Sequence, residues 1–335
     1  MSTVTGVSVA DTPGPDDRGP QGDRASTGRA GDRVFSGLAT GSGALVIGLV
    51  TLVGVFLLWQ AIPAIADDKD NFFLSRAWDV NDTSNLRFGI VELLWTTVVA
   101  STIATLIAVP VGVCVALFIT QYSPRWLARP AASLVDLLAA VPSIIYGFWG
   151  IKTFGPKYQP FQDFLLDKLG WFPLFSKTSV SGTGTILFIG IVLAIMILPI
   201  VTALSREVFA QTPVAHKEGA LALGATKWEM IRTAVLPFGR PGVISAAMLA
   251  LGRALGETIA VTIIVSALAP GTKWSWSLLN GGETFASRIA NNAQEFDSPA
   301  KTGAFIAAGL VLFVLTFVVN AIARIVIERR KAFTE

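Results

Sequence analysis

The sequence is poor in the two residue types that most often bind metals or form cross-links. It contains one cysteine, Cys114, and one histidine, His216, among 335 residues. A single cysteine excludes an internal disulfide and a cysteine-based zinc site, and a single histidine excludes a histidine-rich metal site. We therefore predict no metal site and no catalytic residue in this chain, and we interpret Cys114 as a small apolar residue.

Charged residues are also scarce. Asp, Glu, Lys and Arg make up 15% of the sequence, compared with about 25% in soluble domains. Hydrophobic residues reach 52%, and the mean hydropathy is +0.61. The net charge of +3 is too small and too dispersed to indicate a nucleic-acid-binding surface. The composition therefore predicts a membrane protein that binds no nucleic acid.

Six apolar stretches follow a polar N-terminal segment. Residues 1–36 are rich in Gly, Pro, Asp and Arg and nearly lack large apolar side chains, so we predict a disordered cytoplasmic tail. Residues 37–335 then form the membrane domain. Each apolar stretch has at least about 20 residues, enough for a helix to cross a bilayer core of about 30 Å. The expected spans are Leu38–Ala66, Ile90–Thr120, Ala131–Phe154, Thr185–Ser205, Val243–Leu268 and Gly303–Ile327.

The distribution of Lys and Arg predicts the orientation of these spans. If both termini are cytoplasmic, the inner segments hold fifteen of the 26 Lys and Arg residues and the outer segments hold ten. Cytoplasmic loops carry the excess of positive charge in membrane proteins, so the count favours this orientation. The outer loops are then about 67–88, 155–183 and 269–301. We expect short helices near Phe161–Leu169 and Thr284–Phe296, at the membrane interface or against a docked partner.

The polar loop at about 212–238 has the pattern of two short helices. Thr212 is placed to cap the start of the first, and Gly224 to adopt the left-handed conformation that ends it. Thr226 and Glu229 have the spacing of a capping box at the start of the second helix. Pro237 is expected to end that helix, because proline disfavours helical geometry in the residue before it.

This loop resembles the EAA loop of importer-type ABC transporter permeases. In that pattern Glu-Ala-Ala is followed, after three residues, by Gly, and then by a hydrophobic stretch ending near Ile-x-Leu-Pro. Here Glu218, Gly219 and Ala220 are followed by Leu-Ala-Leu and Gly224, while Gly219 and Ala234 replace the usual Ala and Ile. The resemblance implies that the first short helix is a coupling helix that docks on a separate ATPase subunit. The alternative is an ordinary surface loop of small residues.

The chain has no phosphate-binding loop of the form G-x-x-x-x-G-K-[ST]. We therefore predict that it is not an enzyme and does not hydrolyse ATP. It needs no cofactor of its own, and ATP and magnesium are expected on the partner ATPase.

Two charged residues fall inside the fifth apolar stretch. Arg253 and Glu257 are four residues apart, which places them on one face of a continuous helix. A charge near the middle of a bilayer costs at least about 2.5 to 3.5 kcal/mol, which makes both residues functional candidates. Gly252 and Gly256 add a G-x-x-x-G spacing that favours close approach of a neighbouring helix. A guanidinium suits an oxyanion such as phosphate. The alternative is a buried ion pair that only fixes helix register.

Three segments are similar to phosphate-specific ABC importer permeases of the PstC type. They are GRALGET, which contains Arg253 and Glu257, LLAAVPSIIYGFWG at Leu137–Gly150, and ASRIANN at Ala286–Asn292. The resemblance extends from roughly Leu86 to the C-terminus. It implies an all-α type I ABC importer permease fold with six transmembrane helices, and import of inorganic phosphate across the cytoplasmic membrane of a prokaryote. It also implies a second homologous permease, an ATPase dimer and an external phosphate-binding protein, with Arg253 and Glu257 in the phosphate pathway.

Weaker signals concern the third span. Pro142, beside Ser143, is expected to kink it and to free a carbonyl group for substrate or water. Asp136 is expected to pair with a cytoplasmic-side arginine such as Arg125 or Arg129, and the alternative is that it faces the conduit.

Two alternative functions remain open at this point. A permease for another oxyanion, such as sulfate, molybdate or phosphonate, has the same requirements. A membrane scaffold or signalling subunit is the alternative from a different class. A membrane-embedded enzyme is hard to assemble from one His and three intramembrane acids.

Overall fold

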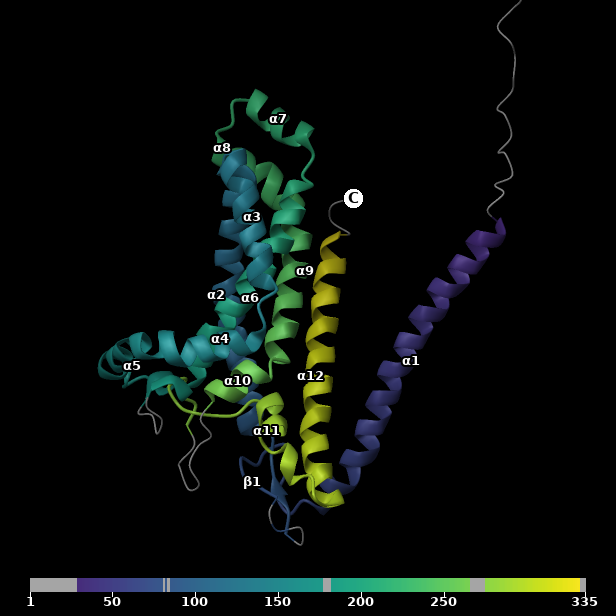
Figure 1. Cartoon of the computed structure of the whole chain (residues 1–335), viewed down its shortest axis with the longest axis vertical. Helices are drawn as coiled ribbons and strands as arrows, with labels where there is room; N and C mark the ends of the chain where they lie inside the picture. Colours follow the sequence, from purple (N-terminus) through teal and green to yellow (C-terminus); the bar gives the residue numbers. More distant parts are fainter. Residues whose placement is uncertain (1–28, 81, 83–84, 177–181, 266–274, 332–335) are drawn as a thin grey trace, which may run out of the picture. The chain divides into compact units, whose positions relative to one another are not determined.

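The computed structural model describes residues 29–80, 82, 85–176, 182–265 and 275–331 (Figure 1). The chain divides into two units between Val53 and Gly54, inside helix α1 (Arg29–Asp67), and each unit is considered by itself. In the first unit α1 begins at Arg29, so residues 29–36 of the predicted tail are helical. The remainder of that tail, residues 1–28, lies outside the described residues.

The second unit is built almost entirely from helices. Its two short strands, β1 (Trp78–Asp79) and β2 (Arg87–Phe88), form an antiparallel pair in which Trp78 is opposite Phe88. After the end of α1 the helices are α2 (Val91–Leu117), α3 (Arg125–Ala139), α4 (Ser143–Trp149), α5 (Gly155–Leu169), α6 (Ile186–Ala210), α7 (Val214–Ala222), α8 (Lys227–Met230), α9 (Leu236–Leu255), α10 (Ile259–Ile264), α11 (Phe285–Asn291) and α12 (Pro299–Lys331). Short π-helical turns follow α2, α4 and α8 at Phe118–Tyr122, Gly150–Phe154 and Ile231–Val235.

Five helices in the described part of the chain are long and apolar enough to cross a membrane, and a bent pair adds a sixth candidate. The five are Gly31–Asp67, Val91–Tyr122, Ile186–Ala210, Lys227–Leu255 and Pro299–Ile325. Each overlaps one of the predicted spans. The membrane-spanning, all-helical fold expected from the apolar stretches is therefore confirmed.

The third predicted span is not a straight helix. It consists of α3 followed by the segment Ser143–Leu169, and the two are bent by 91°. Pro142 lies at the break with a ψ of 139°, which is outside the helical range. The Tyr146 hydroxyl donates a hydrogen bond of 2.9 Å to the carbonyl of Leu138, which also accepts from the backbone N–H of Val141, so Tyr146 ties α4 to the end of α3. The expected kink at Pro142 is thus a complete break.

The fifth predicted span also differs from expectation. Helical structure begins at Lys227, well before Val243, and passes through the π-helical turn into α9 without ending at Pro237. The predicted stop at Pro237 is wrong because this proline lies in the first turn of α9, where its missing N–H is tolerated. At the other end, α9 stops at Leu255 and α10 begins only at Ile259. Residues 266–268 of the predicted span lie outside the described residues.

Helices α2, α6, α9 and α12 stand side by side in Figure 1 and are called the helical row; α2, α6 and α9 contact one another, and α12 contacts α9. Glycines allow the first pair to approach closely. A Cβ at Gly190 of α6 would lie 2.8 Å from the Ile103 side chain of α2, and one at Gly112 of α2 would lie 2.9 Å from Val201 of α6. Small residues serve this role in membrane helices because close packing replaces the hydrophobic drive between helices.

Different structures lie at the two ends of these helices, measured along the helix axes. Helices α7 and α8 lie at one end, while β1 and α11 lie at the other (Figure 1). At the β1 end an apolar cluster joins Phe88, Phe285 and Phe305 to the last turns of α1. At the α7 end a smaller cluster contains Phe209, Met230 and Val235. The candidate residues of the loop therefore lie at the α7 end, whereas Arg253 lies in the last turn of α9.

Candidate functional site

Arg253 lines a groove between three helices. It lies in the last turn of α9, and its side chain is exposed. The groove has a volume of about 460 Å³. Within the described residues, the guanidinium has no hydrogen-bond acceptor and no ion-pair partner. The lining comes from α6, α9 and α12, and consists of Ile200, Met248, Leu249, Gly252, Arg253, Thr316 and Asn320.

Glu257 is separated from Arg253 by a break in the helix. Gly256 ends α9 and Thr258 precedes α10, so the expected shared face of one continuous helix is wrong. Glu257 is only 9% exposed, and its Oε1 accepts a hydrogen bond of 3.2 Å from the backbone N–H of Ala260. In the part of the chain that the structure describes, Glu257 therefore satisfies a free N–H at the start of α10 and makes no ion pair with Arg253.

The G-x-x-x-G spacing does not produce close helix contact at these two glycines. A Cβ added at Gly252 would have Asn320 Oδ1, at 3.9 Å, as its nearest non-local neighbour. A Cβ at Gly256 would have the Gly252 carbonyl oxygen, at 3.7 Å. The prediction of close approach is therefore wrong, because α12 leaves the groove open opposite Gly252.

The structure brings the two helix breaks together. Helix α4, which starts at Ser143 directly after Pro142, packs against α10. The contact is tight, since a Cβ at Gly147 would lie 3.1 Å from the Cα of Ala260. Tyr146 on α4 is also near enough to Arg253 for an electrostatic interaction. The break at Pro142 and the break at Gly256 thus belong to one region of the fold, although more than a hundred residues separate them in the sequence.

The loop that resembles the EAA motif forms α7 and α8, as expected. Gly224 has a φ of +86° and follows the last turn of α7, which confirms its left-handed position. Thr226 and Glu229 form the predicted capping box, with Thr226 N–H donating to Glu229 Oε2 at 2.7 Å. The predicted cap at Thr212 is wrong, because Pro213 occupies the N-cap position of α7 without a side-chain hydrogen bond.

The surface of α7 is open to a partner. Glu218 and Gly219 are exposed, and a Cβ at Gly219 would meet nothing within 4 Å. Ala220 is half-buried against the apolar cluster that contains Met230. Leu223, which follows the last residue of α7, is 90% exposed.

Asp136 pairs across helices rather than within its own. Arg206 Nη2 donates to both carboxylate oxygens of Asp136 at 3.0 Å. The partner is neither Arg125 nor Arg129 but Arg206, another arginine of the predicted cytoplasmic side, because α3 packs against α6 and brings Asp136 beside it. The pair is partly exposed, with Asp136 at 53%.

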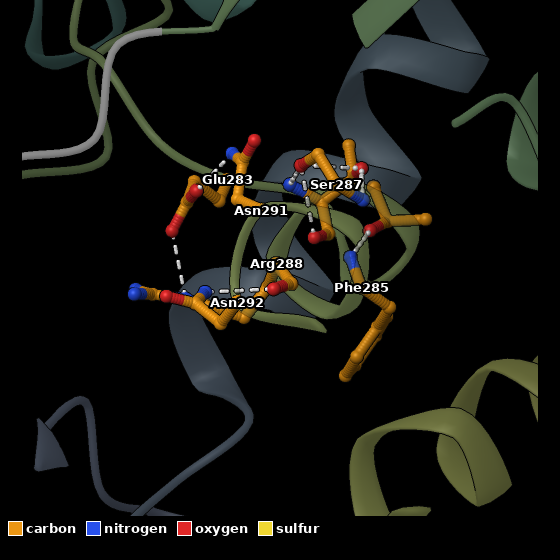
Figure 2. A network of polar contacts seen from close by, with 8 residues as sticks. Glu283, Phe285, Ser287, Arg288, Asn291 and Asn292 are labelled. Atoms are coloured by element: carbon orange, nitrogen blue, oxygen red, sulfur yellow. Dashed lines mark hydrogen bonds and ion pairs between the residues drawn. The ribbon is translucent and has the colours of Figure 1, made fainter. Parts of the chain in front are cut away.

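A buried polar cluster at the β1 end was not predicted as a site (Figure 2). Arg288 Nε lies 2.7 Å from Glu283 Oε2, and Asn291 Nδ2 donates to Glu283 Oε1 at 2.8 Å. The guanidinium also lies over the ring of Trp78, with 5.5 Å to the ring centroid. The segment ASRIANN, which the sequence analysis singled out, forms most of α11. Glu283 precedes that segment, so its pairing with Arg288 was not visible in the motif.

Comparison with known proteins identifies the family. Residues 108–332 match the family described as binding-protein-dependent transport system inner membrane component. The chain belongs to this family. It is 53% identical over 299 residues to the phosphate transport system permease protein PstC 2 of Mycobacterium tuberculosis, covering 88% of this chain and 91% of the relative. It is 39% identical over 302 residues to the PstC protein of Xylella fastidiosa, covering 89% of this chain and 91% of the relative.

The fold is similar to that of an ABC importer of known structure. The chain matches a chain of a bacterial ABC transporter involved in the import of the acidic polysaccharide alginate, with a TM-score of 0.50 and 15% identity. The match covers 87% of this chain and 98% of the other. This similarity concerns the fold alone.

Family membership assigns the broad role of the chain. It is a multi-pass membrane protein and a transport subunit, in agreement with its apolar helices. The matched range 108–332 contains the groove around Arg253, the α7–α8 loop and the Glu283–Arg288 pair.

Proposed function

We propose that this chain is a permease subunit of an ATP-driven importer that conducts inorganic phosphate across the cytoplasmic membrane of a prokaryote. The 53% identity to a protein named phosphate transport system permease supports the substrate. The observation that carries the pathway is that Arg253 lines the groove between α6, α9 and α12 without an ion-pair partner among the described residues. The transporter moves its substrate without making or breaking a covalent bond in it.

The physical argument for Arg253 is the cost of an uncompensated charge. A guanidinium stays protonated in proteins, so it cannot escape a low-dielectric environment by losing its proton. No described residue neutralises it, and insertion of such a charge into a bilayer costs at least about 2.5 kcal/mol. A tetrahedral oxyanion supplies the opposite charge and several acceptors for its planar donors. The groove therefore provides a transient anion site on the transport path.

Glu257, Pro142 and Ser143 have supporting roles in this proposal. Glu257 fixes the backbone beside Arg253 through its hydrogen bond to Ala260. The breaks at Pro142 and Gly256 interrupt two helices where α4 meets α10, and interrupted helices are characteristic of transport sites within membranes. These residues thus shape the pathway, whereas Arg253 contacts the anion.

The α7–α8 loop is the proposed coupling element. Glu218, Gly219, Ala220 and Gly224 would form the contact with an ATPase dimer, which binds the ATP and magnesium. The exposed Leu223 supports a docking role, because a partner groove would remove this apolar side chain from water. Because the ATPase docks from the cytoplasm, the α7–α8 loop lies on the cytoplasmic side of the membrane, and both termini lie on that side too. A second homologous permease, an external phosphate-binding protein and the surrounding lipid complete the assembly, and this chain carries no cofactor.

Uptake by a reconstituted complex tests the substrate. Proteoliposomes that contain the complete importer and its binding protein should accumulate radiolabelled phosphate when ATP is supplied to the ATPase. Excess unlabelled phosphate should suppress accumulation, whereas sulfate, molybdate and phosphonate should not. Competition by one of these anions would favour the alternative oxyanion. Assembly without uptake would favour a scaffold.

Co-purification tests the coupling surface. Leu223→Asp places a charge where the ATPase is proposed to dock, so the ATPase chain should be lost on purification. The matched control is Leu74→Asp, since Leu74 is 74% exposed near β1, at the end of the molecule opposite α7. Retention of the ATPase by Leu223→Asp would contradict the proposed coupling role of this loop.

A further inference from the structure

We propose that Asn320 of α12 is a second anion-binding residue of the groove and contributes to the choice of phosphate over sulfate. Asn320 lines the same groove as Arg253, from the opposite helix. This inference rests on the function proposed above, because it requires an oxyanion to enter the groove.

An asparagine at position 320 costs free energy unless its amide binds something, because it lies inside an apolar helix. It lies within the apolar stretch LVLFVLTFVVNAIA of α12, inside a membrane-spanning helix. Its side chain is exposed, and among the described residues it has no hydrogen-bond partner. An unpaired amide that faced lipid would lose its hydrogen bonds to water without compensation, at a cost of about 2 kcal/mol or more. The groove must therefore offer Asn320 water, substrate or a partner chain.

The geometry directs this amide toward α9 beside Arg253. Asn320 Oδ1 is the nearest non-local atom to a Cβ built at Gly252, at 3.9 Å. Gly252 directly precedes Arg253, so Asn320 approaches α9 within one residue of Arg253, and both residues line the groove. The absence of a side chain at Gly252 keeps the space between them open.

Thr316, the other polar residue that α12 contributes to this groove, already donates its hydroxyl proton within the helix. Thr316 lies one helical turn before Asn320, and its hydroxyl donates a hydrogen bond of 2.9 Å to the carbonyl of Phe313. It has no second proton to donate. The groove thus has two side chains with free donors among its lining residues, Arg253 and Asn320.

The chemistry of an amide favours phosphate. Its N–H₂ group can donate to an anionic oxygen, and its carbonyl oxygen can accept a hydrogen bond. Inorganic phosphate at neutral pH keeps at least one P–OH group, whereas sulfate has none. The amide can both donate to phosphate and accept from its P–OH group, whereas with sulfate it can only donate, so it favours phosphate. Arg253 supplies charge for either anion, and Asn320 distinguishes them.

Direct binding measurements test this assignment. The purified permease–ATPase complex, without the external binding protein, is dialysed against radiolabelled phosphate, with and without sulfate as competitor. Asn320→Leu keeps a similar volume but removes both hydrogen-bonding groups. Phosphate affinity should fall at least about tenfold, the effect of losing one hydrogen bond to a charged group. Sulfate should also compete better than it does with the wild type.

Three further variants separate anion binding from helix packing. Thr316→Val is the matched control in the same groove and should bind phosphate like the wild type. Asn320→Gln retains the amide and should keep most of the affinity. Asn320→Ala removes the amide without adding bulk, and it replaces Asn320→Leu if that variant disturbs assembly. It should show the same loss of phosphate affinity. Wild-type affinity in Asn320→Ala, or equal losses in Asn320→Gln and Asn320→Leu, would overturn the assignment.

Arg253→Met in the same assay distinguishes failure of this inference from failure of the proposed pathway. Full phosphate binding by Arg253→Met means that the groove is not the anion site, and both proposals fail. Lost binding in Arg253→Met, with unchanged affinity and sulfate discrimination in Asn320→Leu and Asn320→Ala, removes only the role of Asn320.

Discussion

Arg253 and Arg288 have the same side chain in two different settings. Arg288 lies in the buried cluster at the β1 end, where Glu283 neutralises it at 2.7 Å and Trp78 covers its guanidinium. Arg253 lines the groove between α6, α9 and α12 and has no acceptor among the described residues. The charge of the first arginine is neutralised within the chain itself. The charge of the second is available for another molecule.

This difference separates a structural charge from a ligand-binding charge. A buried ion pair is satisfied in every state of the transporter that keeps the cluster intact, so its removal damages the fold. An unpaired guanidinium contributes little to packing, so its removal damages function. The distinction depends on the neighbours of each arginine, and each of the following predictions tests it.

The largest expected effect is on the stability of the Arg288→Met variant. Removal of the guanidinium leaves Glu283 buried and uncompensated, which should destabilise the protein by about 3 to 5 kcal/mol. The melting temperature of the purified complex should fall clearly. The double variant Glu283→Gln/Arg288→Met removes the remaining charge and should recover much of the loss. An unchanged melting temperature in Arg288→Met would show that the pair is not buried in the working complex.

Arg253→Met should lower phosphate uptake and leave stability almost unchanged, unlike Arg288→Met. Loss of charge-assisted hydrogen bonds to the anion, worth about 3 kcal/mol, predicts a fall in phosphate uptake of about 100-fold. The melting temperature and the co-purification of partner chains should stay close to those of the wild type. Arg253→Lys should recover part of the uptake, because it restores the charge but not the planar donors. Normal uptake by Arg253→Met would make this arginine structural, like Arg288.

Glu257→Gln should have a smaller effect than either arginine substitution. The glutamine Oε1 can still accept the N–H of Ala260, so the start of α10 keeps its hydrogen bond. We expect a loss of less than about 1 kcal/mol in stability, comparable to weakening a helix cap, and retained uptake. Glu257→Leu is the control that removes the acceptor. Loss of uptake in Glu257→Gln would show that the carboxylate charge itself acts in transport.

Asp136→Asn should have the smallest effect. The pair with Arg206 is partly exposed, and exposed ion pairs contribute about 0 to 1 kcal/mol. The melting temperature should change little, and less in high salt than in low salt. A loss as large as that of Arg288→Met would mean that this pair becomes buried when the complex assembles.

Several local features followed directly from the sequence because they depend on residues close together in the chain. The capping box of Thr226 and Glu229 spans three residues, and the left-handed Gly224 needs only a glycine at the end of a short helix. The spans around α2, α6 and α12 were also predicted, since an apolar run of sufficient length is a local property.

The sequence was a poorer guide to where a helix continues and where it breaks. Arg253 and Glu257 were placed on one helix face, but α9 ends between them, and Glu257 turns to the start of α10. Pro237 was expected to stop a helix and instead lies in the first turn of α9, directly after a π-helical turn. In both cases the decision between continuing and breaking a helix depends on neighbouring helices, which a local pattern does not contain.

The sequence by itself determined that this protein spans a membrane, that it carries a charged residue inside a span, and that a capped helical loop follows the fourth apolar stretch. These conclusions rest on length, hydropathy and short-range hydrogen bonding. Only the tertiary structure decided that Arg288 is neutralised by Glu283, that Asp136 pairs with Arg206, and that Asn320 and Arg253 line the same groove. The physical reason is that charge compensation and groove formation depend on which helices pack together, and that packing joins residues far apart in the sequence.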